Sequence, residues 1–508
     1  MLRKLRIVAL SLLAASAPAL LVSAQAQTTL RIGLAEDPDV LDPTMSRTFV
    51  GRIVYAAMCD KLFDIDDKLN IIPQLALGYD TSADGKTVTI KLRPGVKFQD
   101  GETLDAAAAK FSLERHLNTK GSFRRPEISS IDSIDVVDPL TIKLNLKTPF
   151  APLIAQLADR AGMMVSPKAA QAEGADFGNH PVCAGPFKFV ERVAQGRIVL
   201  ERFADYWDKD KIKIDRVIYT PIPDSTVRLA NLQSGSLDLI ERVQATDIPT
   251  VKKDPKLKLS TQIELGYQGL TINIANSDRA KNNPLAQDAR VRQAFELALD
   301  RDAINQVVYA GEYLPGNQWV SPKNPYYQAD LPVPKRDVAK AKKLLAEAGV
   351  KTPISLTLML PNNPDLRQVG EVIQAMVKEA GFDLKLQATE FATSLNTAEK
   401  GDFDIYMLAW SGRVDPDGNI NVFINSKSPQ NYGHYVSAEV DDLLAKSRLT
   451  SKFEDRKKVY HDLTVIALRD LPIIYLYHRE LLVAHTDKVQ GFVPYPDGLI
   501  RLQGVSMK

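Results

Sequence analysis

The stretch Ser82–Glu114, SADGKTVTIKLRPGVKFQDGETLDAAAAKFSLE, combines several local structural signals in one short run. Ser82–Lys86 is a turn, because Asp-Gly favours the tight connection of a hairpin. Thr87–Leu92 alternates polar and apolar residues, which predicts a half-buried strand. Asp100-Gly101 marks a second turn, and Thr103-Leu104-Asp105 opens a helix. A strand and a helix joined by such turns indicate a mixed α/β chain.

Outward from this stretch, strand and helix patterns continue over the whole chain. Thr29–Leu34, Leu270–Ile274 and Asp404–Ala409 are predicted strands, and Val338–Ala348 and Leu366–Glu379 are predicted helices. A chain of 508 residues exceeds one ordinary hydrophobic core and indicates two or three domains. The predicted fold class is therefore α/β, with strands that return from distant parts of the sequence.

Residues 1–26 have the features of a secretory signal peptide. Basic residues at positions 3, 4 and 6 precede the apolar run Ile7–Val22, and Ala24-Gln25-Ala26 is a small-x-small cleavage pattern. A membrane anchor is the alternative, although serine and proline residues interrupt the run and it is near the lower length limit for a span. We predict cleavage after Ala26 and secretion into the periplasm of a Gram-negative bacterium.

The mature chain would be almost electrically neutral. The full sequence has 64 basic and 62 acidic residues, and loss of the three basic residues in the leader takes the formal charge from +2 to −1. Such a balance gives no general attraction for nucleic acid or for an anionic membrane. After the leader no apolar run is long enough to span a bilayer. We therefore expect neither a nucleic-acid partner nor a membrane-spanning segment.

The chain has two cysteines, Cys59 and Cys183. In an oxidising compartment an even count favours one disulfide. A bridge between such distant positions would stabilise the fold by up to ~4–5 kcal/mol in the chain-entropy model. Two separate buried thiols are the alternative that the sequence leaves open.

No linear motif for catalysis or metal binding is present. The six histidines form no HExxH or HxH pattern, and no Cys/His cluster exists for zinc. A Gly-x-Ser-x-Gly elbow, a phosphate-binding glycine loop and a dinucleotide fingerprint are also missing. Catalytic triads can assemble from distant positions, so these absences reduce the case for an enzyme without excluding one. The prediction is a protein without catalytic residues, cofactor or metal site.

A polar turn follows the predicted strand Asp404–Ala409. The segment Leu408–Asn421, LAWSGRVDPDGNIN, sets Trp410, Ser411 and Arg413 beside two carboxylates where a rigid strand passes into a loop. Binding residues often occupy such positions. A surface turn with a half-buried tryptophan is the alternative.

Taken together, these motifs resemble the bacterial extracellular solute-binding proteins of family 5, the large periplasmic receptors of ABC importers for peptides, nickel, opines and related solutes. The resemblance runs from about Leu30 to the C-terminal region, and Ser82–Glu114 corresponds to the signature region of the family. Relatives often have His where this chain has Gln99, in a stretch that we expect to support the fold. The other matching motifs are Ala184-Gly185-Pro186-Phe187, Tyr206-Trp207, Asp288–Arg301, Val338–Gly349 and Trp410–Asn419.

The resemblance implies the large type of two-lobe periplasmic binding protein fold, whose lobes close on a ligand at a hinge. Lobe 1 would comprise residues 27–70, 183–274 and 481–508, with an extra subdomain at residues 71–182. Lobe 2 would comprise residues 275–480. The chain would cross between lobes near Leu270–Ile274 and Ile473–His485. The implied partners are a small-molecule or peptide-like ligand and the transmembrane subunits of an ABC permease, with a monomer as the usual state.

Departures from the peptide-binding relatives bear on the ligand. Those relatives have an Asp three residues after the loop Trp that pairs with the peptide ammonium, and this chain has Arg413 there. An Arg that holds the carboxylate in dipeptide binders corresponds to Leu360. We expect Arg413 to favour a carboxylate or phosphate, which a guanidinium grips bidentately. An internal ion pair with Asp415 or Asp417 is the alternative.

The predicted ligand site draws on both lobes. Arg160 would face the cleft from lobe 1, with an ion pair to Asp159 or another acid as its alternative. The predicted ligand is a small, anionic solute, such as a modified peptide, an opine-like conjugate or another organic acid. A receptor for ordinary peptides or a nickel chelate is the alternative with the same fold, and a secreted hydrolase or chaperone-like binder is the alternative from another class. The predicted site residues are Trp410, Ser411, Arg413, Arg160, Tyr267 and Gln268.

Overall fold

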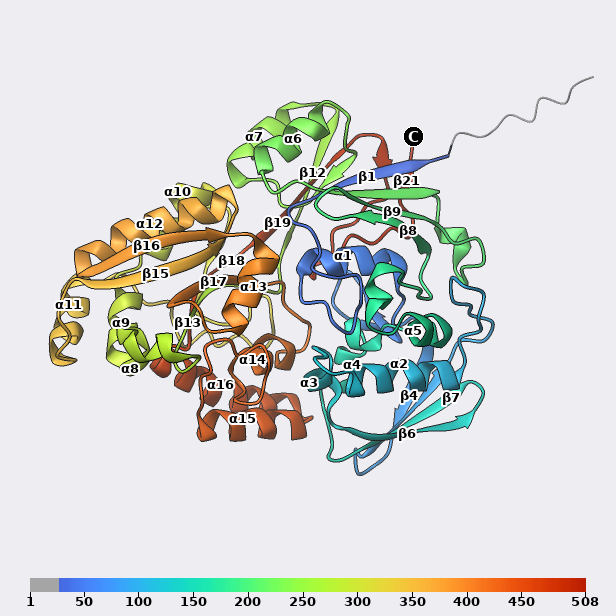
Figure 1. The fold of residues 1–508 in the computed structure, drawn as a ribbon, viewed down its shortest axis with the longest axis horizontal. Helices are drawn as coiled ribbons and strands as arrows, with labels where there is room; N and C mark the ends of the chain where they lie inside the picture. Colours follow the sequence, from blue (N-terminus) through green and yellow to red (C-terminus); the bar gives the residue numbers. More distant parts are fainter. Residues whose placement is uncertain (1–26) are drawn as a thin grey trace, which may run out of the picture.

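Two large β-sheets, one in each lobe, organise residues 27–508, the part of the chain that the computed structural model describes (Figure 1). In Figure 1 lobe 2 lies on the left, and lobe 1 with its additional four-stranded sheet lies on the right. The predicted signal peptide, residues 1–26, lies outside the described residues. The observed fold class is α/β, as predicted.

Lobe 1 is built on a seven-stranded sheet with the order β12-β19-β11-β1-β10-β9-β8. The central strand β1 (Thr29–Leu34) pairs in parallel with both β10 and β11, and its alternate residues Leu30, Ile32 and Leu34 are fully buried. This agrees with the alternation in its sequence. The other helices and strands of this lobe are α1 (Phe49–Met58), β8 (Phe187–Val193), β9 (Arg197–Arg202), β10 (Arg216–Pro221), α6 (Ser225–Gln233), β11 (Leu239–Ile240), α7 (Ile248–Lys253), β12 (Leu257–Ile263), β19 (Glu480–Thr486), β20 (Val489–Gln490) and β21 (Ser506–Met507).

An antiparallel four-stranded sheet, β4-β5-β7-β6, lies within the predicted subdomain 71–182. The predicted strand Thr87–Leu92 is β5, and its alternate residues are buried. The predicted helix is α2 (Ala106–Asn118), and the Asp105 side chain caps it by accepting from the Ala108 amide. The remaining elements are β2 (Phe63–Ile65), β3 (Ile71–Pro73), β4 (Ala76–Thr81), α3 (Arg125–Ile128), β6 (Ile131–Asp138), β7 (Thr141–Leu146), α4 (Leu153–Gln156) and α5 (Pro167–Glu173).

Lobe 2 contains a six-stranded sheet with the order β14-β18-β13-β17-β15-β16. Helix α12 (Pro364–Ala380), which contains the predicted Leu366–Glu379, buries Val369, Ile373 and Val377 along one face. The strands are β13 (Tyr267–Ile272), β14 (Leu314–Pro315), β15 (Ile354–Pro361), β16 (Phe382–Thr389), β17 (Ile405–Trp410) and β18 (Ile473–His478). The other helices are α8 (Pro284–Gln287), α9 (Ala289–Leu297), α10 (Arg301–Tyr309), α11 (Val338–Glu347), α13 (Phe391–Glu399), α14 (Asp417–Ile424), α15 (Ala438–Leu449) and α16 (Phe453–Asp470).

The chain crosses between the lobes at two neighbouring points. Strand β12 belongs to the first sheet and β13 to the second, so the first crossing lies between Ile263 and Tyr267 and precedes the predicted boundary at residue 274. Strands β18 and β19 place the return crossing at Arg479. Arg479 donates to both carboxylate oxygens of Glu264, at 2.7 and 2.8 Å, and thereby ties the two crossings together.

The predicted disulfide between Cys59 and Cys183 is present and joins the end of α1 to the segment before β8. Gln99 reinforces this junction. Its amide nitrogen donates to the carbonyls of Met58 at 2.7 Å and Phe187 at 2.8 Å, and its oxygen accepts from the Cys183 amide at 2.9 Å. The signature stretch thus supports the fold at this position.

Replacing both cysteines, by Cys59→Ser with Cys183→Ser, should lower the melting temperature. The bridge closes a loop with a sequence separation of 124 residues, so the chain-entropy model predicts a loss of about 5 kcal/mol of stability. Thermal melting by circular dichroism measures the change. The wild-type protein with reductant is the control and should melt near the double variant, whereas equal melting of oxidised wild type and variant would contradict the prediction.

Candidate ligand-binding site

A cavity of about 260 Å³ lies between the two lobes. Lobe 1 contributes the loop after β1, the start of α1 and Arg160, and lobe 2 contributes the ends of β15 and β17. Its volume is near the lower end of small-molecule sites, which range over about 300–1,000 Å³. An interlobe cavity of this size suits a compact solute.

The structure brings four of the six predicted site residues to the cavity wall: Trp410, Ser411, Arg160 and Gln268. Tyr267 and Arg413 lie behind that wall. Strand pairing explains part of this arrangement, because β13 and β17 are antiparallel neighbours in which Tyr267 faces Trp410 in register. Tyr267 is buried against Tyr475, with ring centroids 4.7 Å apart, and supports the wall from behind.

Trp410 forms a fixed aromatic part of the wall. Its indole nitrogen donates to Asn419 Oδ1 at 3.1 Å, and its ring meets Phe423 edge to face at 4.8 Å. The Arg413 guanidinium lies 4.2 Å from the ring centroid on the Trp410 side chain. These contacts hold the indole in one orientation.

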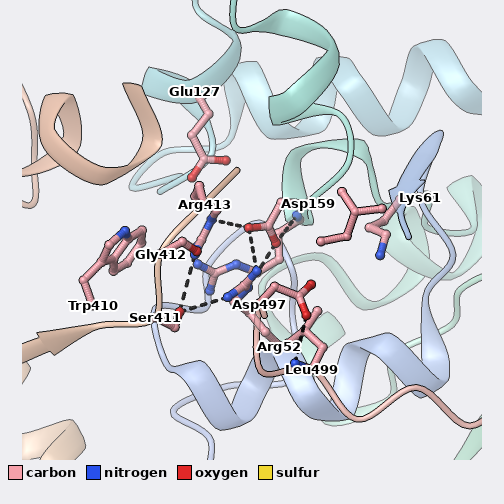
Figure 2. Close-up of polar contacts among 12 residues, drawn as sticks. Arg52, Lys61, Glu127, Asp159, Trp410, Ser411, Gly412, Arg413, Asp497 and Leu499 are labelled. Atoms are coloured by element: carbon pink, nitrogen blue, oxygen red, sulfur yellow. Dashed lines mark hydrogen bonds and ion pairs between the residues drawn. The ribbon is translucent and has the colours of Figure 1, made fainter. Parts of the chain in front are cut away.

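The predicted alternative for Arg413, an internal ion pair with Asp415 or Asp417, is wrong because Arg413 pairs with neither residue. It forms an ion pair with Asp159, which belongs to lobe 1 (Figure 2). Asp415 and Asp417 pair instead with Arg456 and Arg448, each at 2.6 Å. Arg413 therefore links the two lobes beside the cavity, because a carboxylate from the opposite lobe lies within its reach.

Asp159 is the shared centre of this interlobe contact. Arg52 of α1 approaches it with two nitrogens, each at 3.2 Å, while Arg413 approaches from lobe 2 (Figure 2). Burial alone would raise the pKa of Asp159, but Arg413 and Arg52 hold that pKa well below its usual value. Burial and the neighbouring Arg52 lower the pKa of Arg413, and Asp159 opposes that shift.

Ser411 adds a hydrogen bond across the same boundary. Its hydroxyl oxygen accepts from Arg52 Nη1 at 2.9 Å, so a lobe 2 residue on the cavity wall contacts a lobe 1 arginine on the cavity wall. Sequence reasoning missed Arg52. The sequence feature that could have identified Arg52 is its position as the charged residue of the otherwise apolar helix α1, FVGRIVYAAM. A buried arginine in such a helix needs a specific partner.

Arg160 is fully buried and borders the cavity. Its Nη1 donates to the Ser46 carbonyl at 2.7 Å, but within residues 27–508 its Nε and Nη2 have no hydrogen-bond partner. The predicted alternative, an ion pair with Asp159, does not form, since Asp159 accepts from the Arg160 backbone amide instead. Burial, with a further contribution from Arg124, lowers the pKa of Arg160 to about 10, so the guanidinium stays charged at neutral pH.

Several other cavity residues also hold polar atoms without a hydrogen-bond partner in the described chain. Gln268 is buried, and its amide nitrogen is unpartnered. Buried polar groups are normally satisfied, so a cluster of exceptions around one cavity points to a bound solute or ordered water. The residues with such atoms on the wall are Asp37, Arg47, Arg160, Gln268 and Tyr432.

Two broader searches of residues 27–508 complete the description. No group of three or more His, Cys, Asp or Glu side chains is arranged to hold a metal ion. None of the helices in this range is both long enough and apolar enough to cross a membrane.

Comparison with known proteins agrees with this architecture. Residues 70–432 match the family model described as "Bacterial extracellular solute-binding proteins, family 5 Middle". The glutathione-binding protein GsiB of Pectobacterium atrosepticum is 30% identical over 481 residues, which cover 92% of this chain and 92% of that protein.

Solved structures show the same fold. The binding protein AgaA from A. tumefaciens R10, in complex with agropinic acid, aligns with a TM-score of 0.86 and 30% identity over 94% of this chain and 99% of AgaA. DppA from Helicobacter pylori, in complex with the peptide STSA, aligns with a TM-score of 0.85 and 25% identity over 94% of this chain and 98% of DppA. On its sequence match and its two-lobe structure, the chain belongs to family 5 of the bacterial extracellular solute-binding proteins.

Proposed function

We propose that this protein is the periplasmic receptor of an ABC importer and that it captures a small anionic solute between its lobes. The lobes would close on the solute, and the closed form would deliver it to the transmembrane permease. The receptor would act as a monomer and would carry out transport without turnover of its ligand. Secretion would depend on the predicted signal peptide at residues 1–26.

One observation supports the proposal that the ligand is an anion. Arg160 is a fully buried guanidinium on the cavity wall, and within the described residues it has no carboxylate partner. A buried charge without a counter-ion is unfavourable, and a carboxylate or phosphate can satisfy a guanidinium with two parallel hydrogen bonds. Arg160 thus takes the role of ligand anchor that the sequence had suggested for Arg413.

The ligands of the relatives are consistent with this choice. GsiB is named for glutathione, and AgaA was solved with agropinic acid, and both compounds are carboxylic acids. An ordinary short peptide is the second candidate, because DppA of Helicobacter pylori holds the peptide STSA in a similar fold. A cavity of about 260 Å³ favours a compact ligand over an extended peptide.

Replacing Arg160 by Met should weaken solute binding at least about 30-fold, since loss of one partner of a buried charge pair costs about 2 kcal/mol or more. The solute would first be identified by mass spectrometry after release from denatured wild-type protein, with glutathione as the first compound tested. Isothermal calorimetry then compares the two proteins. Arg469→Met, which removes an exposed arginine on α16, is the matched control, and unchanged affinity in Arg160→Met would refute the assignment.

Replacing Asp159 by Asn should favour the open form. The substitution leaves Arg52 and Arg413 facing each other across the lobes without their shared counter-charge, and breaking a buried ion pair costs about 3–5 kcal/mol. Small-angle scattering should show a larger radius of gyration than in wild type. Adding Arg413→Met removes the repulsion and should restore part of the compactness, whereas identical scattering from all three proteins would show that the pair does not control closure.

A further inference from the structure

Six buried charged side chains form one continuous cluster against the cavity. Each is at most 8% exposed, and the cluster spans the boundary between the lobes. Only Arg52 and Arg160 among them reach the cavity wall. The members of this arginine cluster are Arg52, Arg124, Arg160, Arg413, Asp159 and Glu127.

The two carboxylates of the arginine cluster already form ion pairs with arginines of the cluster. Asp159 lies between Arg52 and Arg413, and Glu127 accepts from Arg124 at 2.6 Å. Arg160 is left with backbone contacts. Its Nη1 and Arg124 Nη2 donate to the same Ser46 carbonyl, at 2.7 and 3.3 Å, so two guanidiniums meet at a single neutral acceptor.

Four guanidiniums against two carboxylates leave two positive charges without compensation. The charged residues around the cluster do not compensate these two positive charges, because they pair among themselves. These surrounding pairs are Arg501 with Asp497 and Asp64, Lys61 with Asp64, Arg115 with Asp42, Arg448 with Asp417, and Arg456 with Asp415. In Figure 2 Asp497 lies close to Arg52, and Lys61 lies at the right edge of the group.

Like charges at close range in a protein interior repel far more strongly than in water. The imbalance can be relieved only where the arginine cluster is open to a solute, and that place is the cavity wall at Arg52 and Arg160. Resting on the receptor function proposed above, we propose that the ligand is dianionic, a dicarboxylic acid or a phosphate monoester, with both negative charges held at the Arg52–Arg160 wall.

The arginine cluster also couples the ligand's charge to closure. Arg413 comes from lobe 2 and the other five members come from lobe 1, so the full excess of positive charge assembles only when the lobes meet. A dianion at the wall therefore stabilises the closed form more than the open form. A monoanion leaves one positive charge uncompensated.

Matched pairs of compounds that differ by one negative charge test the proposal. The pairs are glutarate and its monoamide, N-acetylglutamate and N-acetylglutamine, and glycerol 3-phosphate and its methyl ester. Thermal shift finds the binders, and calorimetry measures each pair that contains one. We expect the dianion of a binding pair to bind about 100-fold or more tightly than its partner, and the third pair separates phosphate from carboxylate ligands.

Substitutions test whether the arginine cluster causes the preference. Arg413→Gln reduces the excess from two charges to one at a residue that lies behind the cavity wall, so the ratio of dianion affinity to monoanion affinity should narrow about tenfold. Arg469→Gln is the matched control and should keep the wild-type ratio. Arg124→Gln makes the same change of charge within lobe 1 and is the second variant should Arg413→Gln fail to fold.

The outcomes separate the two proposals. Equal affinity for both members of a binding pair, a wild-type ratio in the variants, or release of a monoanionic or neutral solute from purified protein would overturn the dianion proposal while leaving the receptor function intact. Release of a solute that carries two or more negative charges and no compensating cationic group would support it. If no compound binds and the purified protein releases no solute, the receptor function fails and the dianion proposal fails with it.

Discussion

The contact between the two lobes beside the cavity centres on Asp159. This carboxylate is buried between an arginine of its own lobe, Arg52, and an arginine of the opposite lobe, Arg413. Two buried cations at such close range would repel without it. The same contact places Ser411 against Arg52 and so forms part of the cavity wall. Lobe contact and the shape of the binding site therefore share one electrostatic origin.

The hinge fixes the other side of the cavity. Gly266, between β12 and β13, approaches the end of β17 so closely that a Cβ atom there would lie 1.7 Å from the Trp410 carbonyl oxygen. The Glu264–Arg479 ion pair joins the two crossing segments next to it. Trp410 and Gln268 are consequently held close to the segments at which the chain crosses between the lobes. A site at a hinge can register closure while keeping its aromatic wall in place.

Local sequence signals predicted local structure well, whereas among long-range pairings the sequence predicted the Cys59–Cys183 disulfide but not the contacts between the lobes. The strand Thr87–Leu92 and the Asp105-capped helix follow from alternation and capping, which are properties of neighbouring residues. The predicted lobe boundary follows β13, whereas strand pairing puts β13 in the sheet of lobe 2, and the partners that decide this are distant in sequence. The sequence predicts that Arg413 contacts a ligand anion, with Asp415 or Asp417 as alternative partners, but its partner Asp159 comes from the other lobe, and no periodicity in the sequence encodes such a contact.

Arg160 and Arg413 show why charge compensation, rather than residue type, separates structural from ligand-binding arginines. Both are buried at the lobe interface, but Arg413 has a carboxylate partner and Arg160 has only backbone acceptors within the described chain. In an open form these guanidiniums would be hydrated and their repulsion would be weak. Closure would remove that water, so the anion proposed as the ligand would gain affinity from the change in conformation. By the linkage between binding and conformation, the same anion would shift the population toward the closed form.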